Sequence, residues 1–264
     1  MKVRADVLLF SQGLAESREK AQAFILAGEV YLGEKRIEKA SEQLDEDAVL
    51  SLRGHKPLFA SRGGYKLEKA IDAFKADVSG AVAMDIGAAS GGFTDVLLRN
   101  GAAHVYAIDV GYGQFDWKLR NDPRVTLMER TNARTLTADM FPEKPTLTVM
   151  DVSFISIRLI LPVAAGIMGP EGRFLTLIKP QFEAGKGAVG KHGVVREARE
   201  HIRVLREIRD FTSAMGWRMA ACTFSPIKGP AGNIEFLADL SAVPGEVVSD
   251  DEIERLVKQA HQEL

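Results

Sequence analysis

Short apolar runs alternate with amphipathic segments along most of the chain. Seven runs have the length and composition of buried strands, and they cover residues 81–86, 104–108, 125–128, 147–150, 173–178, 217–224 and 234–238. Apolar residues at helical spacing fill much of the rest, over residues 67–74, 94–99, 155–167, 197–215 and 250–264. Strands that alternate with helices predict an α/β domain of Rossmann-like type, with a mostly parallel seven-stranded sheet.

The first 53 residues have a different pattern. Two short helices are predicted there, the second beginning after Ser17 and ending at Gly28. Strand-like runs follow at residues 30–32, 37 and 49–52. We therefore expect a small α+β module over 1–53, a linker over 54–61 and the α/β domain over 62–264.

Composition is that of an ordinary globular protein, with 46% hydrophobic and 27% charged residues among 264. The single cysteine, Cys222, excludes an internal disulfide and a cysteine-based zinc site, and no metal is expected. The sequence shows neither a signal-type N-terminus nor an apolar stretch long enough to span a bilayer. These features predict a cytoplasmic protein without membrane contact.

Positive charge is unevenly distributed, although the net charge is only −2. Residues 53–75 contain six Lys and Arg against two acids, and residues 179–228 contain ten against five. Solvated helix faces and a surface for RNA explain this pattern equally well. The second segment includes the glycine-rich loop 184–193, which indicates a mobile lid or an RNA contact. A Walker-type phosphate loop is excluded there, because no Ser or Thr follows Gly185-Lys186.

A glycine-rich turn over residues 85–95 separates a buried strand from a helix. Such a turn lets a ligand approach the backbone at a helix N-terminus. A dinucleotide motif is not met, because Ala89 replaces its second glycine, and Asp85 would sit badly beside a pyrophosphate. Asp109 ends the next strand, where an acid can accept both ribose hydroxyls of an adenosine, although a plain surface acid also fits the position. S-adenosylmethionine, a cofactor without phosphate, suits this combination.

We expect the cofactor to contact the turn and the neighbouring strand ends, at Asp85, Gly87, Ala88, Ser90, Gly91, Gly92, Phe93, Asp109, Asn132 and Asp151. The acceptor of the methyl group is constrained by what the chain lacks. The Asn/Asp-Pro-Pro-Tyr motif typical of amino-group methylation is absent, and Cys222 lies in an apolar strand, as a packed core residue would. An oxygen acceptor is therefore favoured.

Four charged residues, Lys66, Asp151, Lys179 and Glu235, match the Lys-Asp-Lys-Glu set of the FtsJ-like ribose 2′-O-methyltransferases. Together with the stretches 61–67, 109–114 and 179–183, they make the chain resemble the TlyA family nearly from end to end. The resemblance implies a class I methyltransferase in which these four residues are catalytic, with ribosomal RNA or ribosomal subunits as partners. Some members of that family are called haemolysins. One departure lies in the glycine turn, where Ala89-Ser90 replaces the Ser-Thr that the family often has.

Residues 14–21, 25–30 and 39–41 resemble the small RNA-binding module of a ribosomal protein of the small subunit. Gly33-Glu34 replaces the Asn-Gly that is common at the turn of that module. Up to Arg53 the module carries eight Lys and Arg against ten acids, so RNA binding would depend on one-sided placement. The predicted RNA contacts are Arg4, Arg18, Lys20, Lys35 and Arg36 in the module and Arg62, Lys186 and Lys191 beyond it.

Methyl transfer to a ribose oxygen requires alignment of the acceptor and removal of one proton. A lysine removes a proton only in its neutral form, which a second lysine in the same crevice favours. Lys179 is the expected base, oriented by Asp151, and Lys66 the positioning cation, with the reverse assignment left open. An RNA-binding protein with a vestigial cofactor pocket and a haemolysin-type membrane-active protein are the alternatives. The oligomeric state is not predicted.

Overall fold

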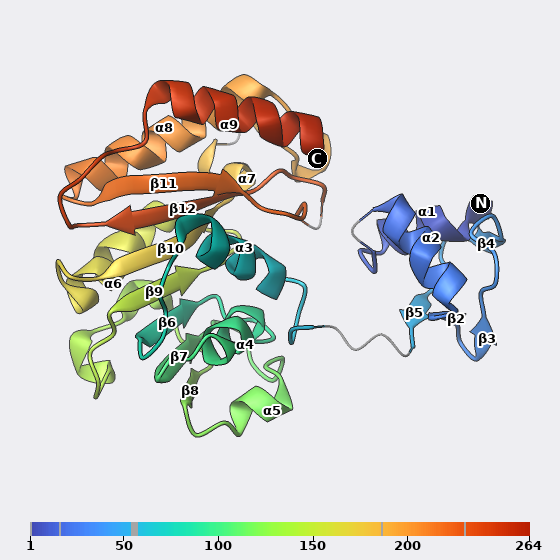
Figure 1. The fold of residues 1–264 in the computed structure, drawn as a ribbon, viewed down its shortest axis with the longest axis horizontal. Coiled ribbons are helices and arrows are strands. Elements are labelled where there is room, and N and C mark those ends of the chain that lie inside the picture. The colour runs from blue at the N-terminus through green and yellow to red at the C-terminus, as the bar shows by residue number, and fades with distance from the viewer. Residues whose placement is uncertain (1, 16, 54–57, 186, 230) are drawn as a thin grey trace. The chain divides into compact units, whose positions relative to one another are not determined.

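The computed structural model describes residues 2–15, 17–53, 58–185, 187–229 and 231–264. The chain divides into two compact units, Met1–Leu58 and Phe59–Leu264 (Figure 1). Residues 54–57 of the expected linker lie outside the described residues. Phe59 is buried in the core of the larger unit, so the second unit begins within the stretch that we expected to be a linker.

The smaller unit contains helices α1 (Ala5–Ser11) and α2 (Arg18–Ala27) and two small sheets. Ser17 caps α2 by accepting a hydrogen bond from the backbone of Lys20, and Gly28 ends it with a φ of +75°. One sheet pairs β1 (Lys2–Arg4) with β4 (Gln43–Asp45), and the other has the order β3-β2-β5, formed by Lys35–Arg36, Val30–Leu32 and Leu50–Leu52. The sequence prediction missed β1 and β4, which are short and largely polar.

A buried carboxylate organises the positive charges of this unit. Asp6 has no exposed surface, and its oxygens accept hydrogen bonds from Arg4, Arg18 and Gln22. The hydrogen bond from Arg4 is the main reason why the pKa of Asp6 lies well below its usual range. Two of the predicted RNA contacts therefore also stabilise the fold, although the Arg4 and Arg18 side chains are still 41% and 50% exposed.

The other predicted contacts of this unit lie on its surface. Lys35 forms a salt bridge with Glu42. Arg36 lies with its guanidinium against Gly28, where an added Cβ would come within 1.9 Å of Arg36 Nη2. Lys20 is exposed, and none of the described acids forms a salt bridge with it.

The larger unit is built on a seven-stranded sheet with the order β11-β12-β10-β9-β6-β7-β8. These strands span Val82–Ile86 (β6), His104–Ile108 (β7), Val125–Met128 (β8), Leu147–Met150 (β9), Arg173–Ile178 (β10), Arg218–Phe224 (β11) and Phe236–Ser241 (β12). Only β12 runs antiparallel to its neighbours, and the other pairs are parallel. The predicted fold class, a mostly parallel seven-stranded sheet behind a small α+β module, is confirmed.

Helices cover both faces of this sheet (Figure 1). On one face lie α3 (Gly64–Phe74) and α4 (Gly92–Arg99), and on the other α6 (Leu161–Met168), α8 (Ala198–Ala214) and α9 (Asp250–Glu263). The central strand β6 contributes to the hydrophobic core on each face of the sheet, because its side chains alternate between the two faces. Met84 and Ile86 pack toward α6 and α8, and Ala83 packs toward α3 and α4. Each large side chain buried in this way stabilises the fold by about 1.5–3 kcal/mol.

Two elements differ from the sequence prediction for identifiable reasons. The helix expected over 155–167 begins only at Leu161, because a 3₁₀ turn (Ile157–Leu159) precedes it and Pro162 occupies the first turn, where proline is tolerated. Strand β12, expected over 234–238, extends to Ser241. Its polar residue Asp239 is accommodated because Arg173 of β10 forms a salt bridge with it at 2.8 Å. The short helices α5 (Trp117–Arg120) and α7 (Pro180–Glu183) were not predicted.

The buried position of Asp6 leads to a prediction about the smaller unit. Asp6→Asn should destabilise it by about 1–3 kcal/mol, because two arginines lose a charged acceptor and one buried oxygen becomes a donor. Amide hydrogen exchange of residues 2–53 measures this locally. The control is Asp45→Asn, whose carboxylate is 62% exposed and pairs with Lys2 on the surface. Equal loss of protection in both variants would contradict the assignment.

Candidate active site

The carboxyl edge of the sheet collects most of the predicted site residues. The glycine turn follows β6, Asp109 follows β7, Asp151 follows β9 and Lys179 follows β10. Glu235 reaches the same edge, because β12 is antiparallel and it lies one residue before this strand. Loops at the carboxyl ends of parallel strands form the usual ligand crevice of such a sheet.

The four residues of the predicted catalytic set form one continuous network. Lys66 Nζ, from α3, lies 2.7 Å from Glu235 Oε2 and 3.3 Å from Asp151 Oδ2. The other oxygen of Asp151, Oδ1, forms a salt bridge with Lys179 Nζ. Charges therefore alternate along the order Glu235, Lys66, Asp151, Lys179, and the three residues other than Asp151 are at most 8% exposed.

Burial and charge act in opposite directions on this network. Burial alone would lower the pKa of Lys66, but the attraction of Asp151 and Glu235 outweighs it and raises that pKa. Burial alone would raise the pKa of Asp151, but Lys66 and Lys179 outweigh it and lower that pKa. Lys66 is therefore held as a cation and Asp151 as an anion.

The two lysines have different surroundings. Lys66 is enclosed by two carboxylates, whereas Lys179 contacts one carboxylate and donates a hydrogen bond to Ser153 Oγ at 2.9 Å. Ser153 is itself exposed to solvent. Lys179 thus has the less negative environment of the two and a polar route to water.

The glycine turn packs closely against two neighbouring segments, the end of β9 and the start of α3. A Cβ on Gly87, whose φ is +85°, would lie 2.7 Å from the carbonyl oxygen of Asp151. A Cβ on Gly92 would lie 2.2 Å from Ser61 Oγ, in the segment that leads into α3. Glycine is required at both positions because the backbones approach so closely. The turn, the end of β9 and the start of α3 are therefore fixed relative to one another.

Asp109 is the polar anchor of the turn on its other side. Its Oδ2 accepts a hydrogen bond from the backbone N–H of Ala89 at 2.8 Å, and its Oδ1 accepts one from Gly111 at 2.6 Å. The first bond holds Ala89 at a φ of +49°, a left-handed conformation that is unusual for alanine. Gln114 Nε2 donates a longer bond, of 3.4 Å, to Oδ1. A carboxylate offers about four lone-pair positions, so Asp109 keeps acceptor capacity for one further donor, at Oδ2.

Asp85 lies behind the turn. Its side chain is fully buried, accepts a hydrogen bond from Thr94 Oγ1 at 2.6 Å and leaves Oδ1 without a partner among the described residues. Burial raises the pKa of Asp85 to about 7, although the bond from Thr94 opposes this. This carboxylate links β6 to the first turn of α4.

The remaining predicted cofactor contacts divide into buried and accessible groups. Ala88 and Phe93 are 4% exposed and pack into the core beside α3 and α4, so they offer only backbone atoms to a ligand. Ser90 is partly exposed, and its carbonyl accepts a hydrogen bond from Asp116. Asn132 caps a 3₁₀ turn by accepting from the backbone of Arg134.

The sequence prediction did not assign several residues that support this network. Gln181 Nε2 donates to Glu235 Oε1 at 3.2 Å. Glu183, whose side chain is 1% exposed, accepts hydrogen bonds from Ser156 Oγ and the backbone of Ile157 at 2.6 and 2.8 Å. Glu183 therefore ties the loop after β9, which carries Asp151, to the segment after β10, which carries Lys179. The stretch 179–183 was noted in the sequence, but only its first residue was assigned a role.

The predicted RNA contacts outside the smaller unit are only partly described. Arg62 is exposed beside α3, Lys186 lies outside the described residues, and the side chain of Lys191 is not described. The end of the glycine-rich loop is anchored, because Asn233 accepts from the backbone of Val195 and donates to the carbonyl of Gly193. The described part of the chain contains no group of His, Cys, Asp or Glu side chains that could hold a metal ion.

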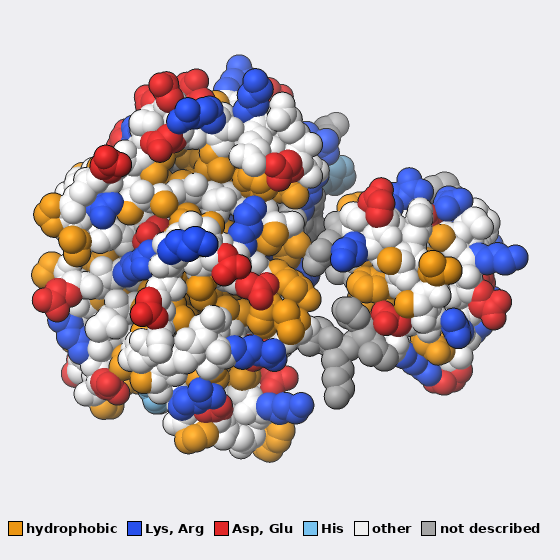
Figure 2. Space-filling view, viewed as in Figure 1, with side chains coloured by type: hydrophobic (Ala, Val, Ile, Leu, Met, Phe, Trp, Pro, Cys, Tyr) orange, Lys and Arg blue, Asp and Glu red, His pale blue; other side chains and the backbone are white. Residues whose placement is uncertain are grey.

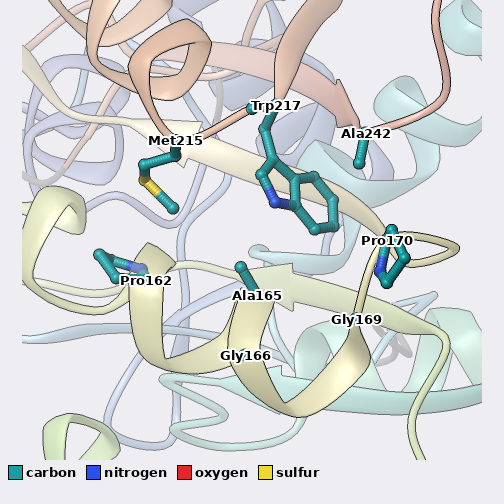
Figure 3. A pocket seen from close by; sticks show the side chains of 9 residues that line it. Pro162, Ala165, Gly166, Gly169, Pro170, Met215, Trp217 and Ala242 are labelled. Carbon is teal, nitrogen blue, oxygen red and sulfur yellow. The ribbon is translucent and has the colours of Figure 1, made fainter.

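An apolar pocket of about 470 Å³ lies at the opposite edge of the sheet (Figure 3). Trp217 and Met215 line it before β11, Pro162 and Ala165 line it from α6, and Ala242 lines it after β12. No charged side chain lines this pocket, so it supplies no acid, base or charged contact to a reaction at the carboxyl edge.

Comparison with known proteins decides the family. The FtsJ-like methyltransferase model matches residues 59–241, and the S4 domain model matches residues 3–50. The 16S/23S rRNA (cytidine-2′-O)-methyltransferase TlyA of Mycobacterium tuberculosis (strain CDC 1551 / Oshkosh) is 40% identical over 98% of this chain and 97% of its own length. The chain is an FtsJ-like methyltransferase of the TlyA family.

Two further proteins are similar to this FtsJ-like methyltransferase along its length. Protein YqxC of Bacillus subtilis (strain 168), whose name assigns it provisionally to the rRNA methyltransferases, is 47% identical over 100% of this chain and 95% of its own length. A solved structure of a haemolysin-named protein from Streptococcus thermophilus is 45% identical, with a TM-score of 0.80 and coverage of 99% of this chain and 96% of that one. The predicted family and enzyme class are confirmed. In the described residues of this methyltransferase, no helix is both long and apolar enough to cross a bilayer.

Glu183 provides a prediction about the support of the site. Glu183→Ala should destabilise the larger unit by about 1–3 kcal/mol, because the Ser156 hydroxyl and the Ile157 N–H lose their acceptor. Chemical denaturation followed by the fluorescence of Trp117 and Trp217 measures the change. The control is Glu171→Ala, which removes an exposed glutamate for which no hydrogen bond or salt bridge to the described residues is found. A loss no larger than that of the control would show that Glu183 is not a structural link.

Proposed function

We propose that this protein is an S-adenosylmethionine-dependent ribose 2′-O-methyltransferase that acts on ribosomal RNA. The observation that carries the proposal is the buried network of Lys66, Asp151, Lys179 and Glu235 beside the glycine turn. The names of the relatives support the substrate class, because TlyA of Mycobacterium tuberculosis is named for the cytidine 2′-O-methylation of 16S and 23S rRNA. The S4 domain at residues 3–50 supports an RNA partner.

The crevice suits a cofactor that has an adenosine at one end and an amino acid at the other. Asp109 Oδ2 retains acceptor capacity for a ribose hydroxyl, and the exposed side chain of Val110 next to it offers an apolar wall for a base. Gly87, Gly91 and Asp151 would hold the other end, because the turn lets a ligand lie close to the backbone. When bound, S-adenosylmethionine supplies a methyl group on a positively charged sulfur. For Asp85, its full burial supports a role in holding the turn rather than in direct contact.

The environment of each lysine supports a division of labour. Lys66, enclosed by Glu235 and Asp151, stays protonated and fixes the position of Asp151. Lys179, in its neutral form, would accept the proton of the ribose hydroxyl, whose oxygen would take the methyl group that S-adenosylmethionine supplies and leave the donor sulfur as a neutral thioether. Asp151 stabilises the resulting ammonium, and Ser153 offers the route by which the proton leaves toward water.

An exposed aromatic residue beside this network suits the acceptor nucleotide. Phe154 is 91% exposed and has a φ of +64°, and its ring centroid lies 5.3 Å from that of Phe182. A left-handed backbone is strained for phenylalanine, and such strain persists only where the surrounding structure enforces it. Phe154 follows Ser153, which accepts the hydrogen bond from Lys179, and its exposed ring could stack on the base of the target nucleotide.

The proposal predicts that Lys179→Ala strongly slows methyl transfer while cofactor binding is retained. Loss of the base should reduce the rate by about 10²–10⁴-fold. Transfer of a tritiated methyl group to 30S subunits, 50S subunits and free rRNA measures the rate, and calorimetry measures cofactor affinity. The control is Lys258→Ala, which removes an exposed lysine on α9. Loss of cofactor binding together with activity would argue against Lys179 as the base.

RNA binding, methyl transfer and leakage of lipid vesicles together separate the alternatives. If the wild-type protein binds RNA but labels neither subunit nor free rRNA, it is an RNA-binding protein with a vestigial pocket. Release of dye from lipid vesicles would instead favour a membrane-active protein.

Phe154 provides a second prediction about the acceptor. Phe154→Ala should raise KM for the RNA by about 5–150-fold, because base stacking on an aromatic ring contributes about 1–3 kcal/mol. Phe154→Tyr, which keeps the ring, should behave like the wild type. Steady-state kinetics with varied RNA at saturating cofactor measure both. Equal impairment of the two variants would mean that the ring face is not what the substrate contacts.

A further inference from the structure

Two large aromatic side chains are exposed on the segment between β7 and β8. Tyr112 is 66% exposed and Trp117, at the start of α5, is 73% exposed. Figure 2 shows hydrophobic side chains beside Lys and Arg at the end of the larger unit where Figure 1 places α5. None of the contacts of the proposed acceptor site involves these residues.

Helix α5 is held so that Trp117 must point outward. The inner side chains Phe115 and Leu119 are buried against the glycine turn, and a Cβ on Gly91 would lie 3.0 and 2.5 Å from them. Asp116 caps the helix and donates its own backbone N–H to Ser90. Exposure of Trp117 is therefore a property of a rigidly docked helix.

Tyr112 is fixed in a similar way. The guanidinium of Arg130 lies over its ring, 4.2 Å from the centroid. Arg130 has a φ of +52°, and its backbone N–H donates to Gly111 at 3.0 Å. Glu129 Oε1 accepts from both Gly113 and Arg120, so it ties the loop of Tyr112 to the helix of Trp117. The strained backbone of Arg130 is thus enforced by the contacts around it.

This segment and residues 129–134, which follow β8, leave an excess of cations without a salt bridge to a described acid. Their acids are engaged: Asp116 caps α5, Asp122 pairs with Arg124, and Glu129 pairs with Arg120. Lys118, Arg130 and Arg134 are exposed, and none of them forms a salt bridge with an acid in the described part of the chain. Exposed aromatic rings among unpaired cations match the chemistry of single-stranded nucleic acid.

We propose that Tyr112, Trp117 and Arg130, with Lys118, form a contact surface for a single-stranded segment of the RNA substrate. The proposal rests on the proposed function, because it takes the substrate to be RNA. The glycine turn follows β6, which lies between β9 and β7 in the sheet. The residues of this surface follow β7 and β8, on one side of the turn. Asp151 and Phe154 follow β9, on the other side. An RNA strand that crosses the carboxyl edge would present its target nucleotide to Lys179 and stack flanking bases on Trp117 and Tyr112.

The test separates RNA affinity from cofactor affinity and from chemistry. Trp117→Ala and Tyr112→Ala are compared with Val243→Ala, which removes an exposed apolar side chain at the opposite edge of the sheet. Fluorescence anisotropy with a labelled rRNA fragment gives Kd for RNA, calorimetry gives Kd for S-adenosylmethionine, and tritium transfer gives kcat at saturating RNA. Each aromatic variant should bind RNA about tenfold more weakly. Cofactor affinity and kcat at saturating RNA should match those of the control.

Lys118→Gln provides an independent measurement that does not depend on stacking, because Lys118 is exposed and none of the described aromatic rings or acids pairs with its side chain. Loss of one phosphate contact should lower the slope of log Kd against log salt concentration by about 0.7–1. Unchanged RNA affinity in all three variants would overturn the proposal. Weaker cofactor binding with unchanged RNA affinity would overturn it in another way, by assigning the surface to the cofactor. A wild-type protein that binds RNA but transfers no methyl group would contradict the proposed function and not the proposed RNA contact surface, because the binding measurements would still report on that surface.

Discussion

The ammonium of Lys66 is the interaction on which the site depends. It links Glu235 before β12 and Asp151 after β9, and through Asp151 it reaches Lys179. Buried charges are stable only when each has a partner, and removing one member leaves the others desolvated and unpaired. The alternating order of charges satisfies this condition with two cations and two anions, so the network constrains three strands and a helix at once.

Local packing brings Lys66 to this position. Gly64, at the start of α3, has no side chain because a Cβ there would lie 2.5 Å from Phe59. The same segment approaches Gly92 of the glycine turn, so the helix that carries Lys66 and the turn that faces the ligand share one contact. Glu183 then fixes the loop after β9 to the residues after β10. Close packing at Gly64 and Gly92 thus fixes α3 beside the turn, and the Glu183 side chain fixes the loop after β9, so that Lys66 and its partners are held in place.

The sequence predicted the central sheet well because its strands are continuous apolar runs, and β8, β9 and β10 have the expected bounds. It placed Asp151, Lys179 and Glu235 at one edge of the sheet, because charged residues at strand ends converge in such a fold. It could not decide whether Lys66 points inward, since that depends on partners far away in the chain. Net charge also did not show which cations are available to RNA. Arg4 and Arg18 are engaged by Asp6, and only the structure separates paired from unpaired cations.

Backbone strain is concentrated where ligands would bind. Of the five described non-glycine residues with positive φ, three follow strands at the carboxyl edge: Ala89 after β6, Arg130 after β8 and Phe154 after β9. Each such residue costs about 1–2 kcal/mol, which a chain free to relax would avoid. The strain persists because hydrogen bonds from Ala89 to Asp109 and from Arg130 to Gly111 hold two of these positions. An edge built in this way is organised before any ligand arrives, so less binding energy is lost in ordering it.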